Sequence, residues 1–274
     1  MTPRRVAALL ALLGVVAGSA SAQGQPGGVV SFSWVIKDLR LAACMDFLIE
    51  PSFAEKQVPE DYRLIPAGRF SALSPSLARE LGGDSVHTAW IPARVCVLEG
   101  ASVTAGDQFV ASSKPGEPVM LAYWGIAATR ATGEPRFDQL YVAEFWTSDW
   151  HVQKPSQDAL IHVSTLKRSL VKLPESTNDR YELKIGKTVL TWDGELRRDS
   201  TATTDSLAAA LLYDGQRGVR FTAAVSGQPV WTRNPAGVFR VSGKDDLAKA
   251  LQASPVRHFG PLLWGGDARV DFSR

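Results

Sequence analysis

The clearest β-hairpin signal in the chain is the stretch Tyr181-Glu182-Leu183-Lys184-Ile185-Gly186-Lys187-Thr188-Val189-Leu190-Thr191-Trp192. Its first half alternates large and polar residues, which is the period of a half-buried β-strand, and its second half is rich in β-branched residues. The glycine between the two halves supplies the positive φ that a tight connection requires. We therefore expect a β-hairpin here.

Similar strand-like runs recur on both sides of this hairpin. A second hairpin turn is expected at Ser226-Gly227-Gln228, and the apolar segment Leu41–Ile49 could be helix or strand. Further strand candidates are Val29–Ile36, Ala93–Leu98, Gln108–Ser112, Val119–Ala128, Gln139–Trp146, Leu160–Thr165, Val219–Val225, Pro229–Arg233 and Ala268–Phe272.

Helix signals are few. The clearest begins at Ser74, an N-cap residue followed by Pro75, and ends at Gly82, which we expect in the left-handed conformation. Two weaker helices are expected at Asp205–Tyr213 and Lys244–Leu251, the second with Ser242 and Asp245 spaced as a capping box.

Many short strands with glycine turns and few helices predict a mainly β protein of the α+β kind. The expected architecture is an antiparallel β-barrel or a large sandwich with a few short peripheral helices. A flat open sheet of so many strands would leave two unpaired edges, which favours closure or layering.

The N-terminus has the three parts of a secretory signal peptide. Arg4-Arg5 is followed by an apolar run from Val6 to Val16, and the small residues Ala20-Ser21-Ala22 precede Gln23. We expect cleavage of residues 1–22 and a periplasmic or secreted location. Residues 23–274 then form one exported β-rich domain, with possible halves at 29–173 and 181–274.

Charge and hydropathy exclude several classes of partner. The chain has 30 Lys and Arg, and without the two leader arginines this number equals the 28 Asp and Glu. No basic block is present, so binding to nucleic acid or to an anionic membrane is not expected. No segment after the leader has the length of a transmembrane helix.

Cys44 and Cys96 are the two cysteines of the chain. An even number in an exported protein is compatible with one disulfide, which would tie the N-terminal segment to a strand. The alternative is two buried thiols that pack as small apolar side chains.

Motifs for common chemistries are absent from the sequence. It contains no Gly-x-Ser-x-Gly elbow, phosphate-binding glycine loop, zinc-type cysteine spacing or paired metal-binding histidines. We therefore expect no cofactor and no metal, and the sequence identifies no catalytic residue.

Tryptophan is the distinctive residue type, because most of the eight lie within or beside predicted strands. They can form an ordinary core or can also line a pocket for a small apolar or planar ligand. Asp46 and Glu144 are carboxylates inside apolar runs, and an inward-facing Glu144 would have a raised pKa. The residues predicted to bind a ligand are Trp90, Tyr123, Trp124, Glu144 and Trp146.

Short stretches covering under a fifth of the chain resemble acetoacetate decarboxylase-like β-barrel proteins. They are Val58-Pro59-Glu60-Asp61-Tyr62-Arg63-Leu64, Trp90-Ile91-Pro92-Ala93-Arg94-Val95-Cys96 and the ending Trp264-Gly265-Gly266-Asp267-Ala268-Arg269-Val270. The resemblance implies a cone-like antiparallel barrel around a mostly apolar cavity.

In that family's enzymes, a lysine beside a second lysine forms a Schiff base with a keto acid. This sequence has no Lys-Lys pair. Its nearest equivalent is Lys167-Arg168, and Lys114 lies in a predicted turn, so no catalytic residue is carried over.

The main functional hypothesis is an exported β-barrel that binds a small apolar or keto-acid-like ligand without catalysis. The alternatives are an acetoacetate decarboxylase-like lyase and an interaction module of the cell envelope. The sequence does not predict an oligomeric state.

Overall fold

The computed structural model describes thirteen segments of the chain, and the predicted leader lies outside them. These segments are residues 32–82, 86–105, 108–112, 119–148, 163–165, 180–193, 196–198, 207–214, 220–225, 228–232, 239–259, 262–264 and 266–273.

A 14-stranded sheet dominates the described residues, and a 3-stranded sheet accompanies it. The large sheet contains β1 (Phe32–Ile49), β2 (Tyr62–Leu64), β3 (Ile91–Ala105), β4 (Gln108–Ser112), β5 (Val119–Arg130), β6 (Gln139–Thr147), β7 (Val163–Thr165), β10 (Leu196–Arg198), β11 (Leu207–Asp214), β12 (Arg220–Val225), β13 (Gln228–Thr232), β15 (Arg257–Phe259), β16 (Leu262–Trp264) and β17 (Ala268–Ser273). The small sheet contains β8 (Arg180–Ile185), β9 (Thr188–Asp193) and β14 (Phe239–Ser242). The helical segments are α1 (Pro51–Ala54), α2 (Pro75–Leu81), the short 3₁₀ turn η1 (His87–Ala89) and α4 (Asp246–Ala253).

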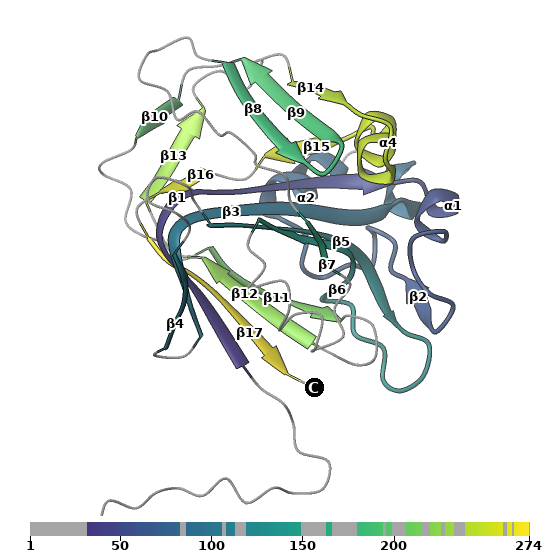
Figure 1. Ribbon diagram of the computed structural model, residues 1–274. Helices are drawn as coiled ribbons and strands as arrows, with labels where there is room; N and C mark the ends of the chain where they lie inside the picture. The colour runs from purple at the N-terminus through teal and green to yellow at the C-terminus, as the bar shows by residue number, and fades with distance from the viewer. Residues whose placement is uncertain are drawn as a thin grey trace, which may run out of the picture.

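Within the large sheet, the strand pairings form a ring. β1 pairs with β17, β17 with β12, β12 with β11, β11 with β6, β6 with β5, and β5 with β3, which pairs back with β1. All of these pairs are antiparallel except β11–β6. Figure 1 shows the ring drawn out into two layers, with β1, β3 and β5 above β17, β12 and β11. The predicted mainly β, antiparallel class is confirmed, and the two layers match the sandwich alternative.

Strand β1 joins regions that are far apart in sequence. Its first residues pair with β17, and its later residues pair with β16 and β15, while β3 runs along its other side. Leu41–Ile49, which the sequence left open between helix and strand, is therefore strand. This one sheet contains strands from both of the proposed halves.

Two of the three predicted helices are present. In α2 the Ser74 side chain accepts a bond from the Leu77 backbone N–H at 3.3 Å, as expected of an N-cap. The expected left-handed ending is wrong, because Gly82 has φ −63° and its N–H closes a tight turn onto the Arg79 carbonyl. In α4 the N-cap is Asp245 and not Ser242, which ends β14.

The predicted helix at Asp205–Tyr213 is wrong, since Leu207–Asp214 is strand β11. Its alanine and leucine content favours helix locally, but pairing with β12 on one side and β6 on the other outweighs that weak preference.

One of the two predicted hairpins forms. β8 and β9 pair directly, and Gly186 at their turn has φ +57°. The turn predicted at Ser226-Gly227-Gln228 does connect two strands, but it does not make a hairpin. In the described residues β12 pairs with β11 and β17, whereas β13 pairs with β10 and β16.

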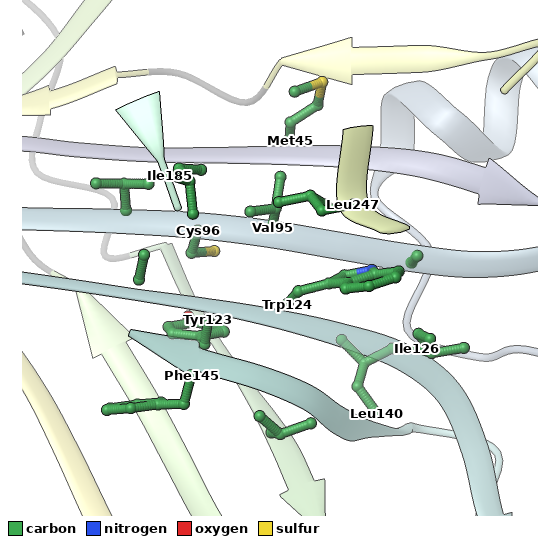
Figure 2. Packing of buried hydrophobic residues seen from close by; sticks show 14 of the residues in the cluster. Met45, Val95, Cys96, Tyr123, Trp124, Ile126, Leu140, Phe145, Ile185 and Leu247 are labelled. Atoms are coloured by element: carbon green, nitrogen blue, oxygen red, sulfur yellow. The ribbon is translucent and has the colours of Figure 1, made fainter. Parts of the chain in front are cut away.

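A large hydrophobic core surrounds the upper layer, and a smaller cluster packs α2 against β1. Figure 2 shows Leu247 of α4 above Trp124 of β5, with Tyr123 and Phe145 on the other side of the strands. α4 and the small sheet therefore cover the face opposite to the lower layer. Within the described residues, no helix has the length and apolar content needed to cross a membrane.

Candidate functional site

The most unusual contact in the core region is an ion pair between neighbouring strands. Asp46 of β1 and Arg94 of β3 lie directly opposite each other in the ladder. Arg94 Nε lies 2.5 Å from Asp46 Oδ1, and Nη2 lies 3.0 Å from Oδ2. The two side chains are only 15% and 12% exposed, for Arg94 and Asp46 respectively. Such a two-point pair fixes the plane of the guanidinium group.

Strand alternation explains why a carboxylate inside an apolar run takes this position. Met45 and Phe47 point to the opposite face of β1 and are buried in the core. Asp46 therefore shares its face with Cys44, two residues earlier.

A disulfide lies beside the ion pair on the same two strands. Cys44 and Cys96 are directly opposite each other, and their Cα atoms are 4.1 Å apart. The predicted bridge is confirmed. Cys96 is two residues from Arg94, just as Cys44 is from Asp46, so the disulfide and the ion pair are neighbours on one face of the β1–β3 ladder, with the Met45–Val95 pair between them.

A shallow hollow opens against the ion pair; its enclosed part has room for about one water molecule, and the rest of its space is open to solvent. Its walls come from the segment leading into α2 and from the neighbouring strands, and they are mostly apolar. Phe70, Leu73, Leu77 and Leu140 contribute apolar surface, and Ser74 contributes a hydroxyl group. Asp46 and Arg94 are the charged residues in this lining. The arrangement is a small apolar recess with one guanidinium group at its wall.

His258 of β15 lies beside Asp46, on the side of β1 away from Arg94. It is the Cα partner of Asp46 in the β1–β15 pairing, so Asp46 lies between His258 and Arg94 across three strands. Residues directly opposite in an antiparallel pair share a face. Asp46 was a candidate buried polar residue from the sequence, whereas Arg94 and His258 were not predicted as site residues. The available signal for Arg94 was a single cation inside the apolar run Ile91–Leu98.

The five residues predicted to bind a ligand lie on both faces of the upper layer. Trp124 and Glu144 are directly opposite each other on β5 and β6, and Trp146 follows two residues later. Tyr123 belongs to the opposite face, and Trp90 lies before β3 with its ring edge-on to His87 at 5.4 Å. Ligand binding by these residues stays a prediction.

Glu144 has an unusual carboxyl group. It is half-buried, and this burial, together with the negative charges of Asp245 and then Asp246, raises its pKa to about 7. From the sequence, a raised pKa was expected only if Glu144 faced a cavity inside the barrel. In the structure Glu144 lies on the face of β6 that it shares with Trp124, and Phe145 lies on the opposite face with Tyr123.

In the described part of the chain, no group of three or more His, Cys, Asp or Glu could hold a metal ion, and the hollow's lining contains no lysine. His151, His162, Lys114 and Lys167 lie outside the described residues.

By sequence, the chain matches no protein-family model and no curated protein. By structure, it is similar to acetoacetate decarboxylases and related enzymes. One is the enduracididine biosynthesis enzyme MppR complexed with pyruvate, at 10% identity and TM-score 0.45 over 93% of this chain and 92% of that chain. Another is acetoacetate decarboxylase from Legionella pneumophila, at 9% identity and TM-score 0.46 over 88% of this chain and 84% of that chain.

A third similar structure is an acetoacetate decarboxylase-like enzyme from Sphingomonas wittichii RW1. It has 13% identity and a TM-score of 0.38 over 89% of this chain and 90% of that chain. The resemblance noted in the sequence thus recurs as a likeness of structure. At these identities the likeness concerns the fold and assigns no activity.

Proposed function

We propose that this protein binds a small organic acid, of the keto-acid kind, in the hollow beside Asp46 and Arg94. The observation that carries the proposal is the nearly buried two-point ion pair in the wall of an otherwise apolar recess. A guanidinium group binds carboxylates in this same two-point geometry. The apolar walls would select a small ligand with a short hydrocarbon body.

The pair has a physical role before any ligand arrives. An isolated guanidinium group in an apolar recess would be strongly disfavoured, and Asp46 compensates its charge. Asp46 also holds the planar group in one orientation, which reduces the entropy lost when a ligand binds. Arg94 has five N–H donors, and its contacts to Asp46 use donors at Nε and Nη2.

Catalysis is the second candidate. The resemblance in the sequence implies a decarboxylase-like lyase, which needs a neutral lysine amine at the keto carbon. The described lining supplies none, so this activity requires a lysine from elsewhere in the chain. Treatment with borohydride in the presence of acetoacetate, followed by mass spectrometry, tests it directly. A lysine that gains the mass of the reduced adduct supports the lyase, and an unmodified chain argues against it.

Export is a further part of the proposal. Support comes from the signal-like residues 1–22 and from the pairing of both cysteines in a disulfide, which persists in oxidising compartments. The test is the intact mass of the protein recovered from the cell envelope or medium. We expect a chain that begins at Gln23; retention of residues 1–22 would contradict export by cleavage.

The binding experiment uses calorimetry with pyruvate and acetoacetate, and 2-butanone as a ketone that lacks a carboxylate. We expect the two acids to bind and the ketone not to bind. Arg94→Ala should lower the affinity for the acids at least about tenfold, and Arg94→Lys should fall between wild type and Arg94→Ala.

Arg136 provides a matched control. It makes a two-point pair with Asp138, at 3.1 and 2.9 Å, but the two side chains are 47% and 46% exposed. Arg136→Ala should leave acid binding unchanged. Equal binding of 2-butanone and pyruvate, or an unaltered affinity in a folded Arg94→Ala variant, would overturn the proposal.

A further inference from the structure

A second polar cluster lies on the face of the upper layer that carries Trp124, away from the hollow. It joins β6 of the large sheet to α4 and to the β8–β9 turn. Trp146 of β6 reaches this turn: a Cβ atom on Gly186 would lie 3.4 Å from Trp146 Nε1 and 3.7 Å from Asp245 Oδ2. Glu144, two residues before Trp146, shares its face.

Asp245 is held rigidly in this cluster by donors from two elements. Its carboxylate accepts bonds from the Lys187 N–H at 3.1 Å and from the Thr188 hydroxyl, both in the β8–β9 hairpin. It also accepts the Ala248 N–H of α4 at 3.0 Å. The Asp245 side chain therefore joins the helix to the hairpin through three hydrogen bonds.

Asp246 adds a second carboxylate with its own partners. It accepts a bond from Gln57 Nε2 at 3.2 Å and forms an ion pair with Lys249 at 3.1 Å. Lys249 is exposed and already engaged. Glu144 itself has no hydrogen bond or ion pair to another described residue in this structure. Among the described residues, Glu144 is therefore affected by the charges of Asp245 and Asp246 and forms no ion pair with a cation.

The other described neighbours of Glu144 form no ion pair with it. The β8–β9 turn brings Lys187, whose side chain is exposed. On β5 the residue opposite Glu144 is Trp124, and the next residue in that row is Val95 of β3. Trp124 is fully buried and its Nε1 has no hydrogen-bond partner. In Figure 2 the nitrogen of this ring lies on the side facing Leu247 of α4.

We propose that Glu144 is a pH-sensitive latch, whose ionisation loosens the packing of α4 and the β8–β9 hairpin on the large sheet. The protonated carboxyl group is neutral and fits beside Asp245 and Asp246. The ionised group adds a third negative charge at a partly dry junction, which favours separation of the elements. Burial and these two neighbours raise the pKa of Glu144 to about 7, so the change falls near neutral pH. This device is independent of acid binding at Arg94.

Hydrogen exchange of the intact protein, read by mass spectrometry and corrected for the intrinsic effect of pH, tests the latch. We expect the amides of α4 and of residues 185–190 to open about tenfold more often at pH 8.5 than at pH 5.5. Amides of the β3–β5 ladder should show no comparable change. Glu144→Gln, which stays neutral, should abolish the difference.

Glu134 is a matched control because it is an exposed glutamate in the β5–β6 connection. Glu134→Gln should retain the wild-type pH dependence. Asp246→Asn provides a second test, since removal of one neighbouring charge should move the midpoint of opening to lower pH. Protection of α4 that does not vary with pH in wild type, a dependence that persists in Glu144→Gln, or a midpoint unmoved in Asp246→Asn would overturn the proposal.

Discussion

Gly100 of β3 lies so close to Ile36 of β1 that a Cβ atom on residue 100 would come within 2.3 Å of the Ile36 Cγ2 atom. The same atom would lie 2.7 Å from the Lys37 carbonyl oxygen. At this point β1 bends: Asp38 has φ +51°, and the β1–β3 register shifts between Leu39 and Leu41. Because of this bend, the part of β1 before Asp38 pairs with β17, and the part after it pairs with β16 and β15. Glycine at position 100 is what allows the two backbones to approach.

Gly100→Ala should therefore destabilise the protein by about 2–3 kcal/mol, because the backbone of β1 must move to admit one methyl group. Urea unfolding followed by circular dichroism measures the change. Gly68→Ala is the control, since a Cβ atom there would meet Thr88 at an ordinary 3.4 Å, and it should cost less than about 0.5 kcal/mol. Equal effects of the two substitutions would show that the approach at Gly100 is not tight.

The ion pair of the candidate site should matter for stability in proportion to its burial. Asp46→Ala leaves the Arg94 charge uncompensated in the recess, and we expect a loss of about 2–4 kcal/mol. Asp138→Ala breaks the exposed pair with Arg136 and should cost about 1 kcal/mol or less. Restoring stability by adding Arg94→Met to Asp46→Ala would show that the unpaired charge causes the loss. A folded Asp46→Ala variant as stable as wild type would contradict this account.

The disulfide should stabilise the protein mainly by lowering the conformational entropy of the unfolded chain. Cys44 and Cys96 are 52 residues apart, so the bridge removes the freedom of a long loop, and the double alanine variant should lose about 2–4 kcal/mol. The ladder around it runs from Trp34↔Ala105 to Ile49↔Ile91 and keeps the strands paired without the bridge. The variant should thus keep its far-ultraviolet spectrum while its urea midpoint falls. A lost spectrum would mean that the bridge is required for folding itself.

Sequence patterns predicted local features well where the residue types within a short segment determine the structure. The β8–β9 hairpin, the α2 N-cap and the partnership of Cys44 with Cys96 all followed from residue type and spacing. Leu207–Asp214 was mispredicted as helix because its alanines and leucines suit a helix, and only distant partners make it a strand. The turn after Val225 failed as a hairpin for the same reason, since both flanking strands have better partners elsewhere.

The candidate site shows a similar limit. Asp46 could be recognised as a carboxylate in an apolar run, but its partner lies 48 positions away on β3. Pairing of β1 with β3 and with β15 is a property of the whole sheet, and it alone brings Arg94 and His258 into one row with Asp46. Glu144 could be identified as a carboxylate among apolar residues, whereas its acidic neighbours lie far away in sequence, at the start of α4.

Asp245 should contribute more to the free energy of unfolding than an ordinary N-cap residue does. Asp245→Ala removes the acceptor for the Ala248 N–H and also both contacts to the β8–β9 hairpin, and we expect a loss of about 2–3 kcal/mol. Ser74→Ala at α2 is the comparison, because its side chain caps one N–H only and should cost about 1 kcal/mol. Thermal unfolding of both variants at one pH measures the difference. Similar losses would indicate that the hairpin contacts of Asp245 contribute little.

Glu144 should make the free energy of unfolding depend on pH with a sign opposite to that of most carboxylates. Its pKa is about 7 in the folded protein against an ordinary value of 4.5, so between these values the folded state holds the extra proton. The contribution of Glu144 is therefore fully present below pH 4.5 and is lost as pH rises through 7. The full shift corresponds to about 3 kcal/mol, and screening by solvent at a half-buried group reduces this to about 1–2 kcal/mol. Urea unfolding of wild type and Glu144→Gln at pH 4.5, 6, 7 and 8 isolates the effect as the difference between the two. That difference should shift in favour of the glutamine variant by this amount as pH rises, and a constant difference would mean that the carboxyl group of Glu144 ionises normally.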